Sequence, residues 1–396
     1  MNKVIIIGSG PAGLLAAIAV GKGAHILERN PYAGRKLLLS GAGQCNFSNK
    51  LSKEDFLKAS GIAVNFLKPA LYEFDNQAFM RLLSEAGCPG YYREDGKAFP
   101  KSLHSADVRD ALLKLALSKG AQISYNTLVT AVKKNLKGEF ELSTEAGKLL
   151  TCEKLIIATG GMSYPETGSD GIGYKLAKSL GHKIIPPHSA LAGVELKAAS
   201  HFKDCAGIAI PQAKVGFCGK KGRICAQGDL LFTHKGLSGP VILDHSHLLG
   251  AGSKMAIMLV EEPGSKLLQL VKDHPRKHLE TALKYLDLPQ NLASAILKHL
   301  GIKPDILMAE LKTTDRNMLA NYLGTAMVTI KAVDGFAEAM ATSGGVPLKD
   351  VSPRSMQSRI CEGLFFAGEI LDYDLPSGGF NIQAAASTGW LAGKAD

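Results

Sequence analysis

Three glycines near the start of the chain have the spacing of a turn that binds a dinucleotide. They are Gly8, Gly10 and Gly13 of the stretch GSGPAG. In a G-x-G-x-x-G turn the first glycine permits the tight turn, the second lets the backbone approach a pyrophosphate, and the third lets a helix pack closely against a strand. The N-terminus of that helix offers free N–H groups and the positive end of its dipole to the phosphates. We therefore expect cofactor contacts from Gly8, Ser9, Gly10, Pro11, Ala12 and Gly13.

An acidic residue follows at the distance expected for a ribose contact. Glu28 ends the apolar part of AHILERN (24–30), about twenty residues after Gly8. A carboxylate at the tip of the second strand of a dinucleotide-binding unit accepts hydrogen bonds from ribose hydroxyls. The same negative charge would repel a 2′-phosphate, which argues against a 2′-phosphorylated nucleotide at this site. Glu28 and its neighbour Arg29 are therefore predicted cofactor residues.

The stretch LLLSGAGQCNFSN (37–49), which follows Arg35 and Lys36, allows three interpretations: a loop that grips a phosphate, a nucleophilic cysteine site, or a glycine-rich solvent loop. Nucleophilic catalysis by Cys45 needs a base, and no histidine lies near it in the sequence. A redox disulfide needs a second cysteine, and none is close in the sequence either. We therefore favour a packing role, or a place at the edge of a cofactor, for this thiol. The cofactor contacts expected here come from Lys36, Ser40, Gly41, Gly43, Gln44, Cys45 and Asn46.

The elements that must position these residues form a strand–helix–strand unit. KVIIIG (3–8) is an apolar, β-branched run typical of a strand buried on both faces in a parallel sheet. LLAAIAV (14–20) is a good helix former, and AHILERN supplies the second strand. A G-x-G-x-x-G pattern alone is weak, but in this context it strongly favours a Rossmann-like unit over an ordinary glycine-rich turn.

Further strands are expected towards the middle and the end of the chain. KLIIATGG (154–161) and GLFFAGEILD (363–372) each predict a buried strand that ends in small residues. ISYNTLVTAVKK (123–134) is expected to form one strand, and 138–150 a hairpin. In LPSGGFNIQAAASTGWLAG (375–393) a glycine turn leads into a small-residue helix, whose N-terminus would offer N–H groups to a ring edge or a phosphate.

In this order the segments resemble the BaiN/YhiN-like family of FAD-dependent oxidoreductases, in the two-dinucleotide-binding flavoprotein superfamily. The resemblance covers nearly the full length and rests on GSGPAG with LERN, GRKLLLSGAGQCNFSN, ATGGMSYPETGSDGIGYKLAKSLGH, GDLLFTHKGLSGPVIL, ATSGGV and GLFFAGEILDYDLPSGGFNIQAAASTG. It implies an α/β fold in which a Rossmann-like domain, with a parallel sheet, helices and a β-hairpin or meander crossover, binds extended FAD. It also implies an inserted β-barrel-like domain and a small helical domain.

The resemblance assigns the domains and the remaining cofactor residues. The FAD-binding domain is expected at 1–190 plus 340–396, the barrel at 191–262 plus 322–339, and the helical domain at 263–321, where apolar residues recur every three and four positions. One departure is visible, because the family usually has arginine where this chain has Gln44. The further residues expected to contact FAD are Val129, Thr159, Gly160, Gly161, Gly368, Glu369, Asp372, Gly378, Gly379, Phe380, Asn381 and Gln383.

The expected chemistry is hydride transfer by the flavin, to which the protein adds orientation, electrostatics and a proton. Tyr164, in the loop after the ATGG strand, and His234, at the end of a strand of the insert, are the candidate proton donors. Tyr373 and Cys45 are further candidates for the same role. The alternatives are that Tyr164 only packs its loop and that His234 is a plain hydrogen-bonded histidine.

The reaction partners are only partly determined by the sequence. No second strand–G-x-G-x-x-G–helix unit is present, because Gly168, Gly171 and Gly173 of TGSDGIGY follow a loop, and these glycines are expected to lie at a helix start. Any NADH or NADPH would therefore visit the flavin transiently. We expect a small-molecule substrate and favour reduction of a C=C bond conjugated to a carbonyl. The alternatives are an amine or aminoketone oxidase that uses oxygen, and a flavin-containing nucleic-acid-binding or regulatory protein.

Composition excludes several other classes. The chain has 46 Lys and Arg against 36 Asp and Glu, a net charge of +10, but these cations are spread along the sequence, which disfavours direct nucleic-acid binding. Seven cysteines without a C-x-x-C pair argue against a disulfide framework and a structural zinc site, and for the reducing cytoplasm. No apolar run approaches the ~18 residues needed to span a bilayer. No metal site and no membrane partner are expected.

Overall fold

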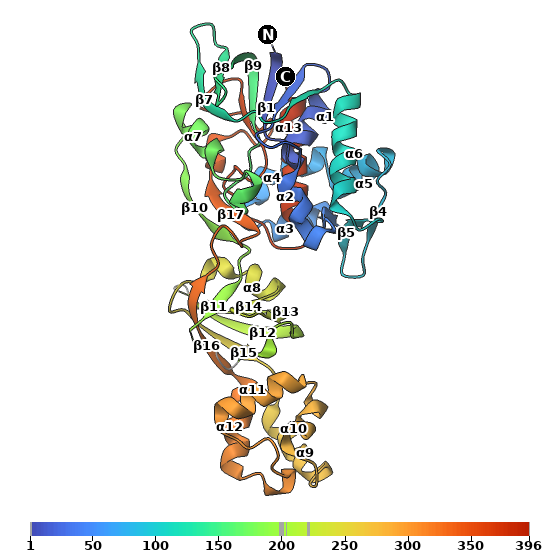
Figure 1. Cartoon of the computed structure of the whole chain (residues 1–396), viewed down its shortest axis with the longest axis vertical. Helices are drawn as coiled ribbons and strands as arrows, with labels where there is room; N and C mark the ends of the chain where they lie inside the picture. Colours follow the sequence, from blue (N-terminus) through green and yellow to red (C-terminus); the bar gives the residue numbers. More distant parts are fainter. Residues whose placement is uncertain (1, 198–201, 203, 220–221, 396) are drawn as a thin grey trace. The chain divides into compact units, whose positions relative to one another are not determined.

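The computed structural model describes residues 2–197, 202, 204–219 and 222–395. The chain divides into two compact units (Figure 1). One unit comprises Met1–Ala190 together with Phe336–Asp396, and the other comprises Leu191–Gly335. The first contains a largely parallel sheet with helices, and the second contains a closed six-stranded barrel and helices. The predicted α/β fold class, with its Rossmann-like sheet and barrel, is confirmed.

The sheet of the first unit has the strand order β6-β2-β1-β9-β8-β7, with β18 paired to β9. Neighbours among β6, β2, β1, β9 and β18 run parallel, whereas β7, β8 and β9 form an antiparallel meander. Ile6 pairs with Ile26 on one side and with Ile156 on the other, so the apolar run of β1 lies in the middle of the sheet. The bounds are β1 Asn2–Ile7, β2 Ala24–Leu27, β6 Gln122–Ser124, β7 Val129–Lys134, β8 Phe140–Thr144, β9 Leu149–Ile157 and β18 Leu364–Phe366.

One strand prediction was wrong. The segment 123–134 forms two strands, β6 and β7, because the chain turns between them. Asn126 adopts a left-handed conformation with φ of 50°, and the backbone N–H groups of Asn126 and Thr127 donate to the carbonyls of Asn30 and Glu28. The turn therefore brings residues 126–129 to the end of β2, and β7 continues in the meander instead of beside β2.

Helices α1 (Pro11–Val20) and α13 (Phe380–Lys394) bring the two ends of the chain together (Figure 1). Their small residues make this possible. A Cβ atom added at Gly389 would lie 2.1 Å from the carbonyl oxygen of Ala12, and one added at Gly393 would lie 2.4 Å from that of Ala16. Close backbone packing of this kind explains why the C-terminal helix is built from Ala, Gly and Ser.

The remaining elements of the first unit surround this sheet. The helices are α2 Arg35–Leu39, α3 Lys53–Ala59, α4 Val64–Glu73, α5 Asn76–Glu85, α6 Ser105–Ser118 and α7 Ile172–Ser179. Strands β3 Ser48–Asn49, β5 Lys97–Pro100 and β4 Gly90–Tyr92 form a three-stranded sheet, and β10 Ile185–Ala190 pairs with β17 Ala341–Gly345. Helix α7 begins after Gly171, which confirms the expectation that the glycines of TGSDGIGY mark a helix start.

The second unit contains the barrel, in the order β11-β14-β13-β12-β15-β16. As expected, β16 (Ala326–Val333) returns to the barrel after the helical stretch. Buried side chains of the strands and the helices form one continuous hydrophobic cluster, and a division of this unit into two domains stays a prediction. The bounds are β11 Val194–Leu196, β12 Ala209–Gly219, β13 Gly222–Phe232, β14 Gly236–Ser238, β15 Lys254–Met258, α8 Pro240–Leu243, α9 Pro263–Asp273, α10 Leu279–Ala282, α11 Gln290–Leu300 and α12 Thr313–Gly324.

Candidate cofactor cleft

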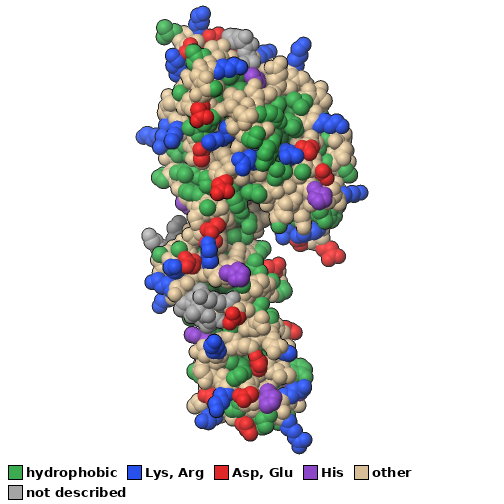
Figure 2. All heavy atoms as spheres, in the orientation of Figure 1, with side chains coloured by type: hydrophobic (Ala, Val, Ile, Leu, Met, Phe, Trp, Pro, Cys, Tyr) green, Lys and Arg blue, Asp and Glu red, His purple; other side chains and the backbone are tan. Residues whose placement is uncertain are grey.

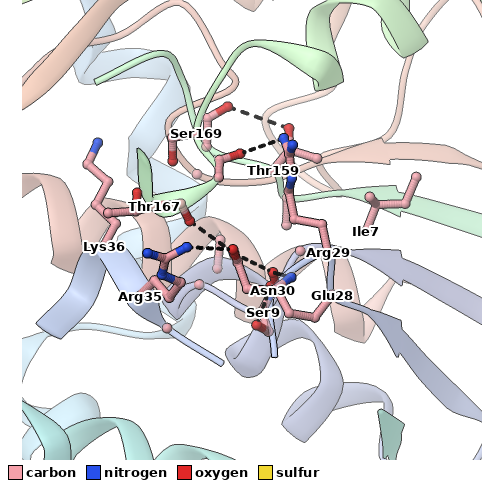
Figure 3. A pocket seen from close by; sticks show the side chains of 18 of the residues that line it. Ile7, Ser9, Glu28, Arg29, Asn30, Arg35, Lys36, Thr159, Thr167 and Ser169 are labelled. Atoms are coloured by element: carbon pink, nitrogen blue, oxygen red, sulfur yellow. Dashed lines mark hydrogen bonds between the residues drawn. The ribbon is translucent and has the colours of Figure 1, made fainter. Parts of the chain in front are cut away.

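A cleft lies at the carboxyl edge of the parallel sheet of the first unit (Figure 3). Its walls are residues that follow β1, β2, β9 and β18, because parallel strands end at the same edge. Crevices at this edge of α/β sheets are where ligands bind. The predicted cofactor residues that line the cleft are Gly8, Ser9, Gly10, Pro11, Ala12, Glu28, Arg29, Lys36, Val129, Thr159, Gly160, Gly368 and Glu369.

The three glycines of the first turn meet different surroundings. A Cβ atom at Gly8, which has φ of 102°, would lie 2.5 Å from the carbonyl oxygen of Ala158, and one at Gly13 would lie 2.0 Å from that of Gly8. A Cβ atom at Gly10 would have no protein atom within 4 Å. Gly8 and Gly13 are therefore required by the fold itself, whereas the space beside Gly10 is open.

The start of α1 faces the cleft without a side-chain cap. Gly10 is the N-cap residue and Pro11 the first helical residue, and no side chain bonds the first N–H groups. These N–H groups and the helix dipole suit a pyrophosphate, and no acidic residue lies in the first turn. The residues present therefore fit a dinucleotide such as FAD.

Glu28 is buried at the end of β2, and protein groups hold both of its carboxylate oxygens. Oε2 accepts from the backbone N–H of Ser9 at 3.0 Å and from its hydroxyl, while Oε1 accepts from the backbone N–H of Asn30 at 2.8 Å and from its side-chain amide at 2.7 Å. Arg35 donates to the Asn30 amide oxygen at 3.0 Å, as Figure 3 shows. The carboxylate is thus fixed in place, and its contact with a ribose stays a prediction.

Residues 163–170, which follow β9 and which we name the strap, are fastened to the segment after β2. Arg29 Nη1 lies 2.6 Å from Asp170 Oδ2 and donates to the Gly168 carbonyl at 3.3 Å. The Asn30 amide donates to the Thr167 carbonyl at 3.0 Å. Thr167, Gly168 and Ser169 also line the cleft. The strap therefore contributes to the lining of the cleft and is held by two other lining residues, Arg29 and Asn30.

A second group of polar side chains lies where β18 ends. Lys36 Nζ is 2.6 Å from Glu369 Oε2 and also donates to the hydroxyl of Ser163. Glu369 Oε1 accepts from that hydroxyl at 3.0 Å and from the backbone N–H of Thr342 at 2.8 Å. Segments from four distant parts of the chain thus meet at one carboxylate.

The predicted residues of the 40–46 stretch do not line the cleft. Gly41, Ala42, Gly43 and Cys45 all have positive φ, so the chain reverses tightly there, which explains the glycines. With its amide oriented to satisfy its neighbours, Asn46 donates to the carbonyls of Ser48 and Ala98 and accepts from the backbone N–H of Gly379. Its side chain is therefore committed to the protein. Cofactor contacts of Ser40, Gly41, Gly43, Gln44, Cys45 and Asn46 stay predictions.

The Cys45 thiol is fully buried, and burial raises its pKa to about 12. A thiol with such a pKa is protonated at neutral pH and is a poor nucleophile. This agrees with the expectation that Cys45 packs, or borders a cofactor, and does not attack a substrate.

The predicted residues near the start of α13 also lie outside the cleft lining. Gln383 is fully buried and bonds to Ser48, Phe74 and Ser387, and the Asn381 side chain bonds to the backbone of Leu375. The other predicted cofactor residues that do not line the cleft are Gly13, Gly161, Asp372, Gly378, Gly379 and Phe380. Gly161 packs against Thr342, since a Cβ atom there would lie 2.4 Å from the threonine hydroxyl.

The two candidate proton donors lie in different units. Tyr164 is half-buried in the strap, adopts φ of 53°, and burial raises the pKa of its phenol. His234 is exposed in the turn between β13 and β14. Tyr373, the further candidate, is buried, and burial raises the pKa of its hydroxyl.

Sequence reasoning missed several residues of the cleft. Asn30 and Arg35 flank predicted residues and could have been found by continuing from Glu28 along the chain. Residues of the strap and of the turn after β6 carry no local signal, because only the folded chain brings them to the cleft. The missed residues are Asn30, Arg35, Thr127, Leu128, Thr167, Gly168, Ser169, Ile172, Ala367 and Ala385, besides apolar and glycine neighbours.

The described residues hold neither a candidate metal site nor a helix that could span a membrane. No group of three or more His, Cys, Asp or Glu side chains in this part of the chain is arranged to hold a metal ion. Among the same residues no helix is both long enough and apolar enough to cross a bilayer.

Comparisons with known proteins agree over the whole chain. The model of the HI0933-like protein Rossmann domain matches residues 2–395. A ribosomal RNA dihydrouridine synthase of Escherichia coli (strain K12) is 30% identical over 397 residues, 98% of this chain and 96% of that protein. A 3-dehydro-bile acid delta(4,6)-reductase of Clostridium scindens is 30% identical over 411 residues, 100% of this chain and 99% of that protein.

A solved structure shares the fold at lower identity. The 3-ketosteroid delta1-dehydrogenase of Sterolibacterium denitrificans, in complex with 1,4-androstadiene-3,17-dione, superposes with a TM-score of 0.54 at 13% identity, covering 99% of each chain.

Proposed function

The chain belongs to the HI0933-like Rossmann family of FAD-dependent oxidoreductases, and on that premise we propose that it reduces a C=C bond conjugated to a carbonyl, with NADH or NADPH as hydride source. The single observation that carries the proposal is the chemistry common to two of its full-length relatives. A dihydrouridine synthase saturates the uracil C=C bond, and a delta(4,6)-reductase of 3-dehydro-bile acids saturates C=C bonds of a 3-oxo steroid. In both substrates the reduced bond is conjugated to a carbonyl.

The proposed seat of FAD is the cleft of the first unit. The free N–H groups at the start of α1 would bind the pyrophosphate, and the open space at Gly10 would admit it. Bound FAD would supply the hydride carrier. The hydride goes to the β-carbon of the substrate, and a proton must reach the α-carbon.

Tyr164 is the proposed source of that proton. Because burial raises its pKa, the phenol keeps its proton at neutral pH and remains a donor. Its loop also contains Ser163, whose hydroxyl bonds to Glu369 in the cleft wall, so Tyr164 is next to a residue that contacts the lining.

A uracil in RNA is a second candidate substrate beside a small enone. The E. coli relative acts on ribosomal RNA, and the net charge of +10 suits a polyanion. The name of this relative gives RNA more weight than the sequence alone gave it. Figure 2, however, shows Lys and Arg side chains scattered among Asp and Glu on the face that it presents. The experiment below therefore offers both substrates to the reduced flavin.

The test starts from purified protein with its flavin oxidised, under anaerobic conditions. NADH or NADPH should bleach the flavin absorbance, and a 4-en-3-one steroid or unmodified ribosomal RNA should restore it, with the product two hydrogen masses heavier. Restoration by RNA only, or by the enone only, identifies the substrate class. Bleaching by amines with peroxide release in air, and none by NADH or NADPH, would instead establish an oxidase.

The seat of FAD has its own test. Gly10→Val places a side chain in the open space, so the protein should fold and lose bound FAD. Gly250→Val is the matched control, because Gly250 also has no atom within 4 Å of an added Cβ and lies in the second unit. The measurements are the flavin content per chain and the thermal unfolding of the apoprotein. If the Gly10→Val protein keeps its flavin, this cleft is not the FAD-binding site.

A further inference from the structure

Lys36 and Glu369 form an ion pair inside the cleft wall. Their charged atoms are 2.6 Å apart, and the side chains are 25% and 19% exposed, so water screens them only in part. The remaining partners of the pair are neutral: the Ser163 hydroxyl bridges lysine and carboxylate, and the Thr342 N–H donates to Glu369 Oε1. The pair therefore adds no net charge to the cleft, although each member carries a full charge.

The order of the strands shows which end of the cleft holds this pair. Strands β2, β1, β9 and β18 lie side by side in that order. Glu28 follows β2, the glycine turn follows β1, and Glu369 follows β18, on the far side of β9. A dinucleotide whose ribose lies at Glu28 and whose pyrophosphate lies at the glycine turn extends from there towards Glu369. The Lys36–Glu369 pair therefore borders the half of the cleft that is left for the flavin.

Charges at such a position change how readily the flavin accepts electrons, and thus its reduction potential. Reduction of a flavin adds negative charge, so a nearby cation raises its reduction potential and a nearby anion lowers it. In a partly desolvated cleft these effects are stronger than in water. An exposed, screened pair would not have this effect.

We propose that Lys36 is a positioning residue which holds Glu369 and cancels its charge, so that the charge balance within the Lys36–Glu369 pair keeps the reduction potential of bound FAD from shifting. The inference rests on the proposed seat of FAD in this cleft. Lys36 acts through Glu369, Ser163 and Thr342, which it links across segments from α2, the strap, β17 and the end of β18. Removal of one member leaves the other charge uncompensated, whereas removal of both restores neutrality.

A double-mutant cycle tests this. Lys36→Met, Glu369→Gln and the double variant are purified with FAD, and the midpoint potential of each is measured by equilibration with a reference dye under anaerobic conditions. We expect a lower potential for Lys36→Met, a higher one for Glu369→Gln, and a value close to the wild type for the double variant. Lys36→Arg, which keeps the charge, should stay close to the wild type and serves as the control.

Each other outcome is decisive. Shifts of the two single variants in the same direction, or no shift in either, would overturn the inference, and so would loss of FAD from all three variants, because the pair would then be a purely structural element. Loss of FAD from one single variant that the double variant recovers supports it. The proposed FAD site is tested separately, and flavin retained by the Gly10→Val protein would overturn it.

Discussion

The residue type and position of Glu28 predict that it is the acid of a dinucleotide-binding unit. They do not predict which protein groups bond to its carboxylate. An acid at the tip of the second strand is recognisable from its distance to Gly8. The four hydrogen bonds that fix its carboxylate come from Ser9, which is nineteen residues earlier in the chain, and from Asn30, two residues later. Asn30 in turn contacts Arg35 and the strap. A single residue such as Asn30 therefore links Glu28 to the strap.

The proposed proton donor gives a prediction at the residue scale. Tyr164→Phe removes only the hydroxyl, so we expect unchanged FAD content and a turnover number about 10²-fold lower, the size typical of a lost general acid. The pKa of Tyr164 is raised above its ordinary value of 10.0. The donor is therefore protonated throughout the neutral range, and wild-type turnover should not lose this group below about pH 10.

The measurement is the turnover number of both proteins between pH 6 and 10 with the substrate found in the bleaching experiment. Tyr72→Phe, in an exposed tyrosine of α4, is the matched control. If Tyr164→Phe stays within twofold of the wild type at every pH, the proton comes from another group.

At the scale of elements, the strap gives a prediction about cofactor exchange. Asp170→Asn breaks the ion pair with Arg29, while the new amide oxygen can still accept from the backbone N–H of Ile172 at the start of α7. Partly exposed ion pairs contribute about 0.2–1 kcal/mol. We therefore expect FAD to dissociate up to about fivefold faster from the variant, because the wall of the cleft opens more easily.

Dissociation is followed by the rise of flavin fluorescence after dilution. High salt should bring the wild-type rate close to that of the variant, since it screens the same ion pair. Glu141→Gln is the control, because it breaks the Lys133–Glu141 pair on β7 and β8, away from the cleft. Equal dissociation rates in the wild type and in Asp170→Asn would mean that the strap does not limit the release of FAD.

At the scale of the whole molecule, buried thiols make stability depend on pH. Cys45 and Cys152 are fully buried, and burial raises the pKa of each to about 12 from a usual 9.0. In the unfolded chain both thiols ionise near pH 9, whereas in the folded chain they stay protonated. Unfolding then releases protons, so stability is intact below about pH 9 and falls as the pH rises towards 12.

Each of these thiols should contribute about 1.4 kcal/mol of lost unfolding free energy per pH unit in that range. Urea unfolding of the apoprotein at pH 7.5 and at pH 10 measures the loss. Cys152→Ala should reduce the pH dependence, whereas Cys225→Ala, at an exposed cysteine, should not. If the unfolding free energy of the wild type is equal at both pH values, the pKa values of these buried thiols are not raised.

The sequence predicted the local part of this architecture well. The apolar run 3–8, the glycine turn and the small-residue helix after it are β1, the start of the cleft and α1, because strand, turn and helix depend on residues close together in the chain. The return of β16 to the barrel and the helix start at Gly171 followed from the same kind of pattern. Where a single residue changed the backbone direction, at Asn126, the apolar pattern hid the break between β6 and β7.

By itself the sequence determined the family, the glycine turn and part of the cleft lining. Only the tertiary structure decided which of these side chains meet. Lys36 and Glu369 are separated by 333 positions, and Asn46 reaches the backbone of Gly379 across a similar length of chain. Such contacts depend on how helices and strands from both ends of the chain pack, and no periodicity or spacing encodes that packing. For this reason the glycines of the stretch 37–49 predicted a cofactor contact, while the ion pair of the preceding Lys36 with Glu369 became visible only in the folded molecule.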